Sequence, residues 1–148
     1  MIGRLRTVKL PNAPIGSEEA KLRRLVRELV ETWSSTWTSK NTTAASKFYS
    51  KAPDHVFFDI GPIHVGWDQY RKNIQKSFGE TESLSLTLND DLRVTVLGSM
   101  ALTTATGHLS SKNKDGKSFD SNIRFSGVWE KKGKLWLVIH DHWSRSRV

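Results

Sequence analysis

The spacing of the apolar residues changes once along this chain, from a helical period to a strand period. Between residues 17 and 80 the apolar side chains recur mostly every three or four positions, which is the spacing of one helix face. From residue 84 onward they alternate with polar ones, which is the spacing of a half-buried β-strand. Helices followed by neighbouring strands indicate the α+β class, with an antiparallel sheet.

The expected elements follow from these periods and from the turn residues between them. We expect three helices, over residues 17–39, 44–49 and 67–78. We expect strands over residues 55–59, 84–88, 92–97, 100–109, 119–131 and 135–143. The basic segment 1–16 contains Pro and Gly residues that interrupt helices, so it is predicted to be a flexible arm. A single domain is predicted over residues 17–148.

Composition excludes several classes of protein. The chain has no cysteine, so disulfides, Cys-based zinc sites and a Cys nucleophile are excluded. It has no apolar run near the ~20 residues of a membrane span and no recognisable signal peptide, so we expect a cytoplasmic protein that does not enter a membrane. Its net charge of +8 would suit nucleic acid, but its aromatic residues do not interleave with the basic ones. Nucleic acid is therefore not the expected partner.

Two histidines stand out in the last expected strand. Strict alternation would put Trp136, Val138, His140 and His142 on one face. Two neighbouring imidazoles can bind a metal, move a proton or contact a ligand, or they can simply be satisfied by nearby polar groups. No third metal ligand can be placed beside them, so we predict no metal site.

A carboxylate and a guanidinium are the other candidate site groups. Asp59 follows three apolar residues and precedes Gly61-Pro62, so it is expected at the end of a buried strand, where burial would make it a useful base. It could equally cap the turn. Arg124 lies among apolar residues and could orient Asp59 or an anionic ligand, or form a structural ion pair. Alternation puts Trp129 on the face opposite Arg124, and we expect Arg124 to face the site.

The order of these features resembles that of SnoaL-like domains, which belong to the nuclear transport factor 2-like superfamily together with ketosteroid isomerases and polyketide cyclases. The resemblance covers about residues 17–144. Its motifs are Phe57-Phe58-Asp59, Gly66-Trp67-Asp68, Arg124-Phe125-Ser126-x-Val128-Trp129 and Gly133-Lys-Leu-Trp136-x-x-x-His140-x-His142-x-Ser144. The resemblance implies helices packed in a curved antiparallel sheet, a cone with a pocket, and a homodimer formed through the outer face of the sheet.

The isomerase residues carry over only in part. Asp59 matches the proton-abstracting aspartate of the isomerases. Their first-helix tyrosine corresponds to Trp33, which has no hydroxyl, and their protonated aspartate aligns near Phe125. Because two donors of the oxyanion hole are absent at these positions, true ketosteroid isomerase activity is not expected.

The sequence therefore predicts a pocket protein for a hydrophobic small molecule, with no cofactor. If it is an enzyme, we expect acid–base chemistry on a carbonyl compound: isomerisation, cyclisation, dehydration or hydrolysis. The predicted catalytic residues are Asp59, His140 and His142. The predicted pocket residues are Arg124, Trp33, Trp37, Tyr49 and Trp129. The alternative is a non-catalytic association or ligand-binding module that forms a homo-oligomer.

Overall fold

The computed structural model describes residues 17–39 and 41–147, so the predicted basic arm lies outside the described residues. The helices are α1 (Glu18–Ser39), α2 (Thr43–Ser46) and α3 (Trp67–Glu80). The strands are β1 (Val56–Phe58), β2 (Ile63–Val65), β3 (Thr81–Leu88), β4 (Arg93–Leu97), β5 (Met100–Asn113), β6 (Ser118–Lys132) and β7 (Leu135–Arg145). The predicted α+β class is confirmed.

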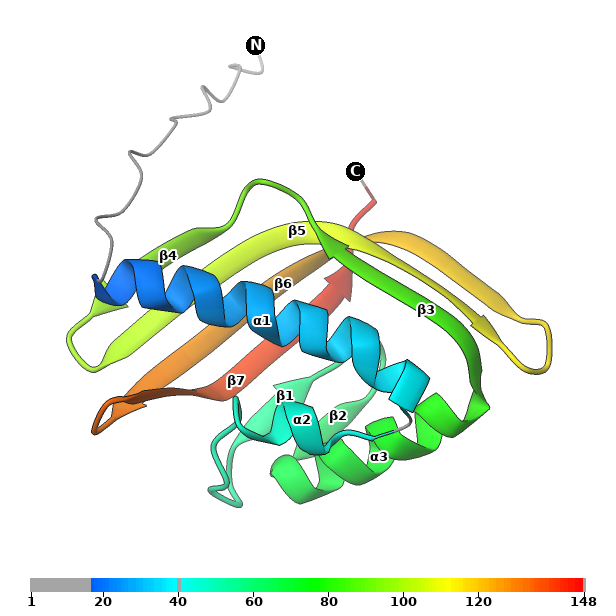
Figure 1. Ribbon diagram of the computed structural model, residues 1–148, viewed down its shortest axis with the longest axis horizontal. Coiled ribbons are helices and arrows are strands. Elements are labelled where there is room, and N and C mark those ends of the chain that lie inside the picture. The colour runs from blue at the N-terminus through cyan, green and yellow to red at the C-terminus, as the bar shows by residue number, and fades with distance from the viewer. Residues whose placement is uncertain (1–16, 40, 148) are drawn as a thin grey trace, which may run out of the picture.

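The strands form one curved sheet in the order β2-β1-β7-β6-β5-β3. Both β3 and β4 pair with β5, β3 along residues 107–113 and β4 along residues 100–104. All pairings are antiparallel except that of β1 with β7. The long strands β5, β6 and β7 bend together around the helical side of the molecule (Figure 1).

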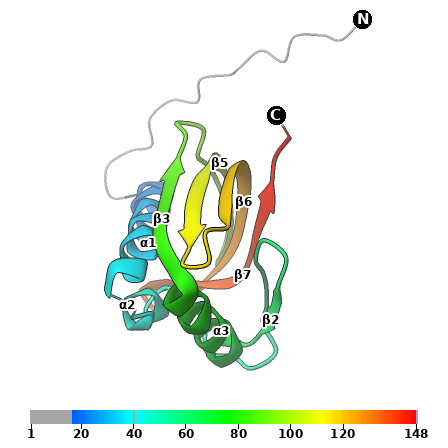
Figure 2. The ribbon, with the colours of Figure 1, turned by 90° about the vertical axis from the view of Figure 1, so that its right-hand side faces the viewer.

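Helix α1 lies along the concave side of the sheet, and α3 closes one end of it (Figure 2). The apolar face of α1 is buried from Leu22 to Trp33, as its period predicts. Ser17 caps the helix, because its Oγ accepts the amide hydrogen of Ala20 at 3.1 Å. Glu18 then accepts a hydrogen bond from the Trp136 indole and pairs with Lys131, which ties the start of α1 to the sheet.

The chain enters α3 through Gly66, whose φ of 77° suits glycine alone. A Cβ on Gly66 would also lie 3.2 Å from the carbonyl oxygen of Pro53. From this start α3 buries Trp67, Tyr70 and Phe78 against the end of the sheet. The turn after β1 leads into β2, a three-residue strand that the sequence analysis did not anticipate.

An irregularity in β7 decides which of its side chains face the core. Val128 pairs with His140 but Trp129 pairs with Val138, so Ile139 is an extra residue without a partner on β6. Such a β-bulge lets two successive side chains stay on one side of the sheet. Trp136 and Val138 point inward before the bulge, and Asp141 and Trp143 point inward after it.

Candidate functional site

A cavity of about 300 Å³ lies between the helices and the concave face of the sheet. Its walls are mostly apolar and aromatic, with a few hydroxyl and amide groups. The lining residues are Trp33, Asp59, Ile60, Tyr70, Ile74, Ser77, Phe78, Thr81, Leu84, Leu86, Leu109, Ser111, Asn113, Phe119, Ile123 and Trp143. Apolar walls with a few placed polar groups are typical of a site for a small organic molecule.

Asp59 is the single carboxylate among the described residues that line this cavity. It follows β1, where Phe57 is fully buried, and the turn at Gly61 carries the chain back. The Asp59 side chain is 25% exposed, and its Oδ1 accepts the amide hydrogen of Ile60 at 2.8 Å. The carboxylate is therefore fixed at the cavity wall but still accessible.

His64 lies behind Asp59 and was not anticipated from the sequence. Its side chain is 1% exposed, and across the β1–β2 hairpin it pairs with Phe57. Its Nδ1 is 3.0 Å from Nδ2 of Asn73, which can only donate. Nδ1 is thus the acceptor, so the neutral ring carries its proton on Nε2, 3.8 Å from Oδ2 of Asp59. A small movement of Asp59 would complete a carboxylate–imidazole pair.

A second carboxylate, Asp141, is completely buried behind the cavity. The Trp33 indole donates to the Tyr49 oxygen at 2.9 Å, and the Tyr49 hydroxyl donates to Oδ2 of Asp141 at 2.7 Å. Oδ1 of Asp141 has no hydrogen-bond partner. Burial raises the pKa of Asp141 from 3.8 to about 7, against the effects of the Tyr49 hydroxyl and the Trp143 indole, which lower it, and the charge of Asp59 adds to the rise.

Tyr70 lies between these two carboxylates. Its ring is 4.6 Å from the His64 ring and 5.5 Å from the Tyr49 ring, between centroids. Burial raises the pKa of the Tyr70 hydroxyl well above its usual range, and the negative charges of Asp141 and Asp59 add to the shift. Tyr70 therefore stays protonated at neutral pH.

The expectation that His140 and His142 share a face with Trp136 and Val138 is wrong. It assumed unbroken alternation, and the bulge at Ile139 turns both histidines to the outer face of the sheet. There the His140 Nδ1 is 2.6 Å from the Val56 carbonyl oxygen, and both imidazoles pack edge-on against Phe58. The structure does not bring either histidine to the cavity with Asp59.

The expected orientation of Arg124 is also wrong. Arg124 is exposed on the outer face and donates to the Arg145 carbonyl oxygen at 3.3 Å. Trp129 is the inward residue, because the core takes the large aromatic side chain and leaves the charge in water. Its indole donates to Thr103 Oγ1 at 2.9 Å, within the core and away from the cavity lining.

The other predicted pocket residues have three different placements. Trp33 lines the cavity. Tyr49 lies behind it, within the hydrogen-bonded chain to Asp141. The side chain of Trp37 lies outside the described residues.

The site residues that the sequence analysis missed carry only weak signals. His64 stands between Ile63 and Val65, and a lone polar residue between two apolar ones normally points to water. Here Ile63 and Val65 are the exposed ones. Tyr70 shares the apolar side of the third helix with Ile74 and Phe78, which marks it as a core residue. Asp141 is inward only because of the bulge.

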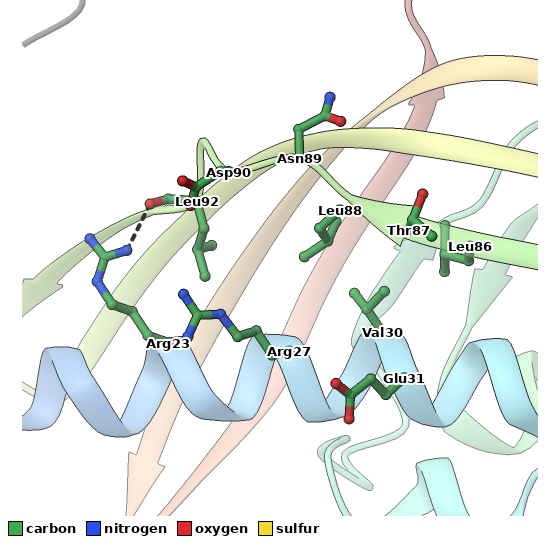
Figure 3. A pocket seen from close by; sticks show the side chains of 10 residues that line it. All are labelled: Arg23, Arg27, Val30, Glu31, Leu86, Thr87, Leu88, Asn89, Asp90 and Leu92. Carbon is green, nitrogen blue, oxygen red and sulfur yellow. Dashed lines mark hydrogen bonds between the residues drawn. The ribbon is translucent and has the colours of Figure 1, made fainter. Parts of the chain in front are cut away.

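A second hollow, of about 420 Å³, lies between α1 and the segment that joins β3 to β4 (Figure 3). Arg23 spans it, donating to the Leu92 carbonyl oxygen at 2.9 Å and pairing with Glu19 at 3.0 Å. Arg27 and Glu31, both on α1, also line this hollow (Figure 3). The hollow holds no buried ionisable group among its lining residues, so the site is placed in the smaller cavity.

The family model of the SnoaL-like domain matches residues 26–147, so the chain belongs to this family. Solved structures of the nuclear transport factor 2-like superfamily share its fold. One, from Salmonella enterica serovar Typhimurium, is 21% identical with a TM-score of 0.71, covering 86% of this chain and 94% of its own. No curated protein is similar enough to the sequence to count as a match.

Two further structures carry functional descriptions of their own. A candidate aromatic ring hydroxylase from Novosphingobium aromaticivorans is 18% identical with a TM-score of 0.73, covering 93% of this chain and 94% of its own. A candidate calcium/calmodulin-dependent protein kinase II association domain from Xanthomonas campestris is 21% identical with a TM-score of 0.69, with the same coverage of 93% and 94%. At these identities the likeness shows the fold alone.

The described residues contain no group of three or more histidine and acidic side chains placed to hold a metal ion. None of the described helices has the length and apolar character that a membrane crossing requires.

Proposed function

We propose that this domain binds a small hydrophobic carbonyl compound in the 300 Å³ cavity and catalyses a proton transfer on it. The observation that carries the proposal is the position of Asp59, the one carboxylate in the described lining of an otherwise apolar and aromatic cavity. Asp59 is the general base, and His64 is the group that orients it. Proton transfer of this kind requires no cofactor.

The surroundings of Asp59 fit this role. The Ile60 amide donates to Oδ1, and Nε2 of His64 lies 3.8 Å from Oδ2. Tyr70, which stays protonated, is one of the described residues that line the same cavity. Isomerisation, cyclisation, dehydration and hydrolysis can each begin with such a proton transfer. His140, His142 and Arg124 are left out of the proposal, because they lie on the other face of the sheet.

The exchange of α-protons of a ketone tests the base without knowledge of the natural substrate. The probe is 2-tetralone, a small aromatic ketone, incubated in D₂O and followed by ¹H NMR. We expect the protein to accelerate the exchange and Asp59→Asn to lose about 10²–10⁴-fold of that acceleration, which is the usual contribution of a general base. The affinity for the ketone, measured by tryptophan fluorescence, should change little.

The control is Asp120→Asn, which removes an exposed carboxylate on β6 that lies outside the cavity lining. It should exchange the ketone like the parent protein. Equal exchange rates in Asp59→Asn and the parent would remove Asp59 as the base. Ketone binding without any exchange in the parent protein would leave a binding protein and remove the catalytic part of the proposal.

We also propose that the domain forms a homodimer through the outer face of its sheet. Pairing in the β1–β2 hairpin puts Val56 beside Val65 and Phe58 beside Ile63 on that face. Phe58, Ile63 and Val65 are 36%, 63% and 53% exposed. On β5 and β6, Leu102 pairs with Val128 on the same face. Exposed apolar side chains gathered on one face of a sheet are typical of a protein–protein interface.

Light scattering during size-exclusion chromatography tests the dimer. We expect a mass of two copies at micromolar concentration, and one copy for the double variant Ile63→Lys with Val65→Lys, because two buried charges would be unpaired in the interface. Ala44→Lys, an exposed position on α2, is the control and should stay dimeric. A parent protein that elutes as a monomer would refute the dimer while leaving the cavity proposal intact.

A further inference from the structure

Leu86 stands between the two hollow spaces of the molecule. Among the described residues it alone lines both the cavity of about 300 Å³ and the second hollow of about 420 Å³. We propose that Leu86 is a specificity-determining residue: its side chain is the partition between the two spaces and limits the length of the apolar tail that a ligand in the cavity can have. The proposal rests on the cavity of the proposed function and describes its ligand more closely, as a carbonyl compound with an unbranched apolar tail.

Strand β3 leads from one space to the other. Leu84, Leu86 and Leu88 are half-buried and pack against the core, because alternate side chains of a strand share one face. Leu84 lines the cavity but not the hollow, and Leu88 lines the hollow but not the cavity. At about 3.3 Å per residue, the step from Leu84 to Leu88 is roughly 13 Å of strand. One inward side chain, that of Leu86, lies within this step.

Helix α1 faces β3 and shows the same step. Val30 lines the hollow, and Trp33, three residues later, lines the cavity. Three residues of helix rise by about 4.5 Å and lie on one side of the helix. The Ser34 Oγ on α1 accepts the amide hydrogen of Leu86 at 3.3 Å, which fixes the partition where α1 and β3 meet. Figure 3 shows the hollow with Leu92 near one end and Leu86 at the other.

The hollow behind the partition suits a neutral tail. Its apolar lining residues are Val30, Leu86, Leu88 and Leu92. Its charged lining residues are two cations and two carboxylates, Arg23, Arg27, Glu31 and Asp90. Equal numbers of opposite charges give the hollow no preference for an anion or a cation. A tail that passes the partition therefore gains from apolar contact and not from charge.

The consequence is a limit on ligand length. Each CH₂ group that a ligand buries tightens its binding about fourfold. This gain ends when the tail reaches Leu86, because a further carbon has to displace a packed side chain that is held between α1 and β3. Affinity should therefore rise with chain length and then level off. The chain length at which it levels off is the property that Leu86 determines.

A series of straight-chain 2-alkanones, from 2-hexanone to 2-dodecanone, measures this limit. Their binding is followed by tryptophan fluorescence, since Trp33 and Trp143 line the cavity. In the parent protein we expect affinity to rise about fourfold per carbon up to a break and then to level off. In Leu86→Ala the break should move to ketones about two carbons longer, so that the longest ketone gains about tenfold or more. The shortest ketones, which do not reach the partition, should bind with nearly unchanged affinity.

Two further single variants sharpen the test. Leu86→Phe enlarges the partition, so its break should come at a shorter ketone than in the parent, and it gives the answer even if Leu86→Ala fails to fold. Leu92→Ala is the matched control, because Leu92 lines the hollow but not the cavity. The ketone at which its affinity levels off should be the same as in the parent protein.

The double variant Leu86→Ala with Leu88→Phe tests where the longer tail goes. Leu88 lines the hollow and not the cavity, so a ring at this position fills the space behind the opened partition. The gain of the long ketones in Leu86→Ala should then return to about the parent value. A gain that survives in the double variant would place the tail outside the hollow and overturn the proposal.

Failure of the partition and failure of the proposed function give different results. A break at the same ketone in the parent, Leu86→Ala and Leu86→Phe overturns the partition, as does an affinity in the parent that rises to 2-dodecanone without a break. Either result leaves the cavity of the proposed function intact, because the ketones still bind. If no ketone binds to the parent or to Leu86→Ala, the cavity itself fails as a ligand site and the partition fails with it.

Discussion

The two faces of the β6–β7 ribbon show how little residue type alone says about a site. On the outer face, Arg124, His140 and His142 are partly or fully exposed and make ordinary contacts with backbone and with Phe58. On the inner face, Trp129 and Asp141 are completely buried. The residue types that suggest chemistry face outward, and the one polar group that is costly to bury faces inward. Position, more than type, therefore marks the functional candidate.

The largest expected difference between the faces is in packing. Trp129→Ala should lower the free energy of unfolding by about 3–5 kcal/mol, because it leaves a cavity among core residues and removes the partner of Thr103. Arg124→Ala should change it by less than about 0.5 kcal/mol, because the guanidinium is exposed. Urea unfolding of both variants measures the contrast.

Equal losses in the two variants would contradict the assignment of faces. Trp129→Phe is the intermediate variant, since it keeps an aromatic ring and loses the hydrogen bond to Thr103. It should fall between the other two, and a loss as large as that of Trp129→Ala would place the energy in the hydrogen bond instead of the packing.

The next effect is specific to the inner carboxylate and depends on pH. The pKa of Asp141 is about 7 in the folded state and about 3.8 in the unfolded chain. The folded state therefore holds the proton more tightly. The contribution of Asp141 to the free energy of unfolding is greatest below pH 3.8 and falls as the pH rises to 7. Asp141→Asn removes this fall.

At about 1.36 kcal/mol per pKa unit, the parent should lose about 2 kcal/mol relative to Asp141→Asn between roughly pH 5.5 and pH 8.5. Unfolding by urea at the two pH values measures this difference. His142→Ala serves as the outer-face control in the same range. A gap between the parent and Asp141→Asn that does not change with pH would show that Asp141 stays ionised.

The long elements could be predicted because each repeats its signal many times. Helix α1 was anticipated from its apolar period and from the cap at Ser17, and β5, β6 and β7 from their alternation. The short hairpin strand β2 could not be predicted, because three residues carry no period. Tertiary packing decides which side chains of β2 face the core: His64 is buried, and Ile63 and Val65 are exposed.

The candidate site was only half predictable for the same reason. Asp59 was found because a Gly-Pro turn follows an apolar strand, and both signals are local. Asp141 was missed because its direction depends on Ile139, one extra residue whose bulge is defined by pairing with β6. Pairing between strands is not visible in one strand's own sequence, so alternation counted from Trp136 gave the wrong face for every residue after the bulge.

The smallest contrast lies within the outer face and separates the two histidines. His140 is half-buried, and its Nδ1 donates to the Val56 carbonyl oxygen at 2.6 Å, which joins β7 to β1. His142 is exposed and makes a T-shaped contact with the same Phe58 ring. We expect His140→Ala to cost about 1 kcal/mol, the worth of one hydrogen bond, and His142→Ala to cost less than about 0.5 kcal/mol. Urea unfolding in low salt near neutral pH resolves this difference. If His142→Ala were the more costly variant, the outer face would contain an interaction of His142 beyond Phe58, and the dimer interface would be the first place to look for it.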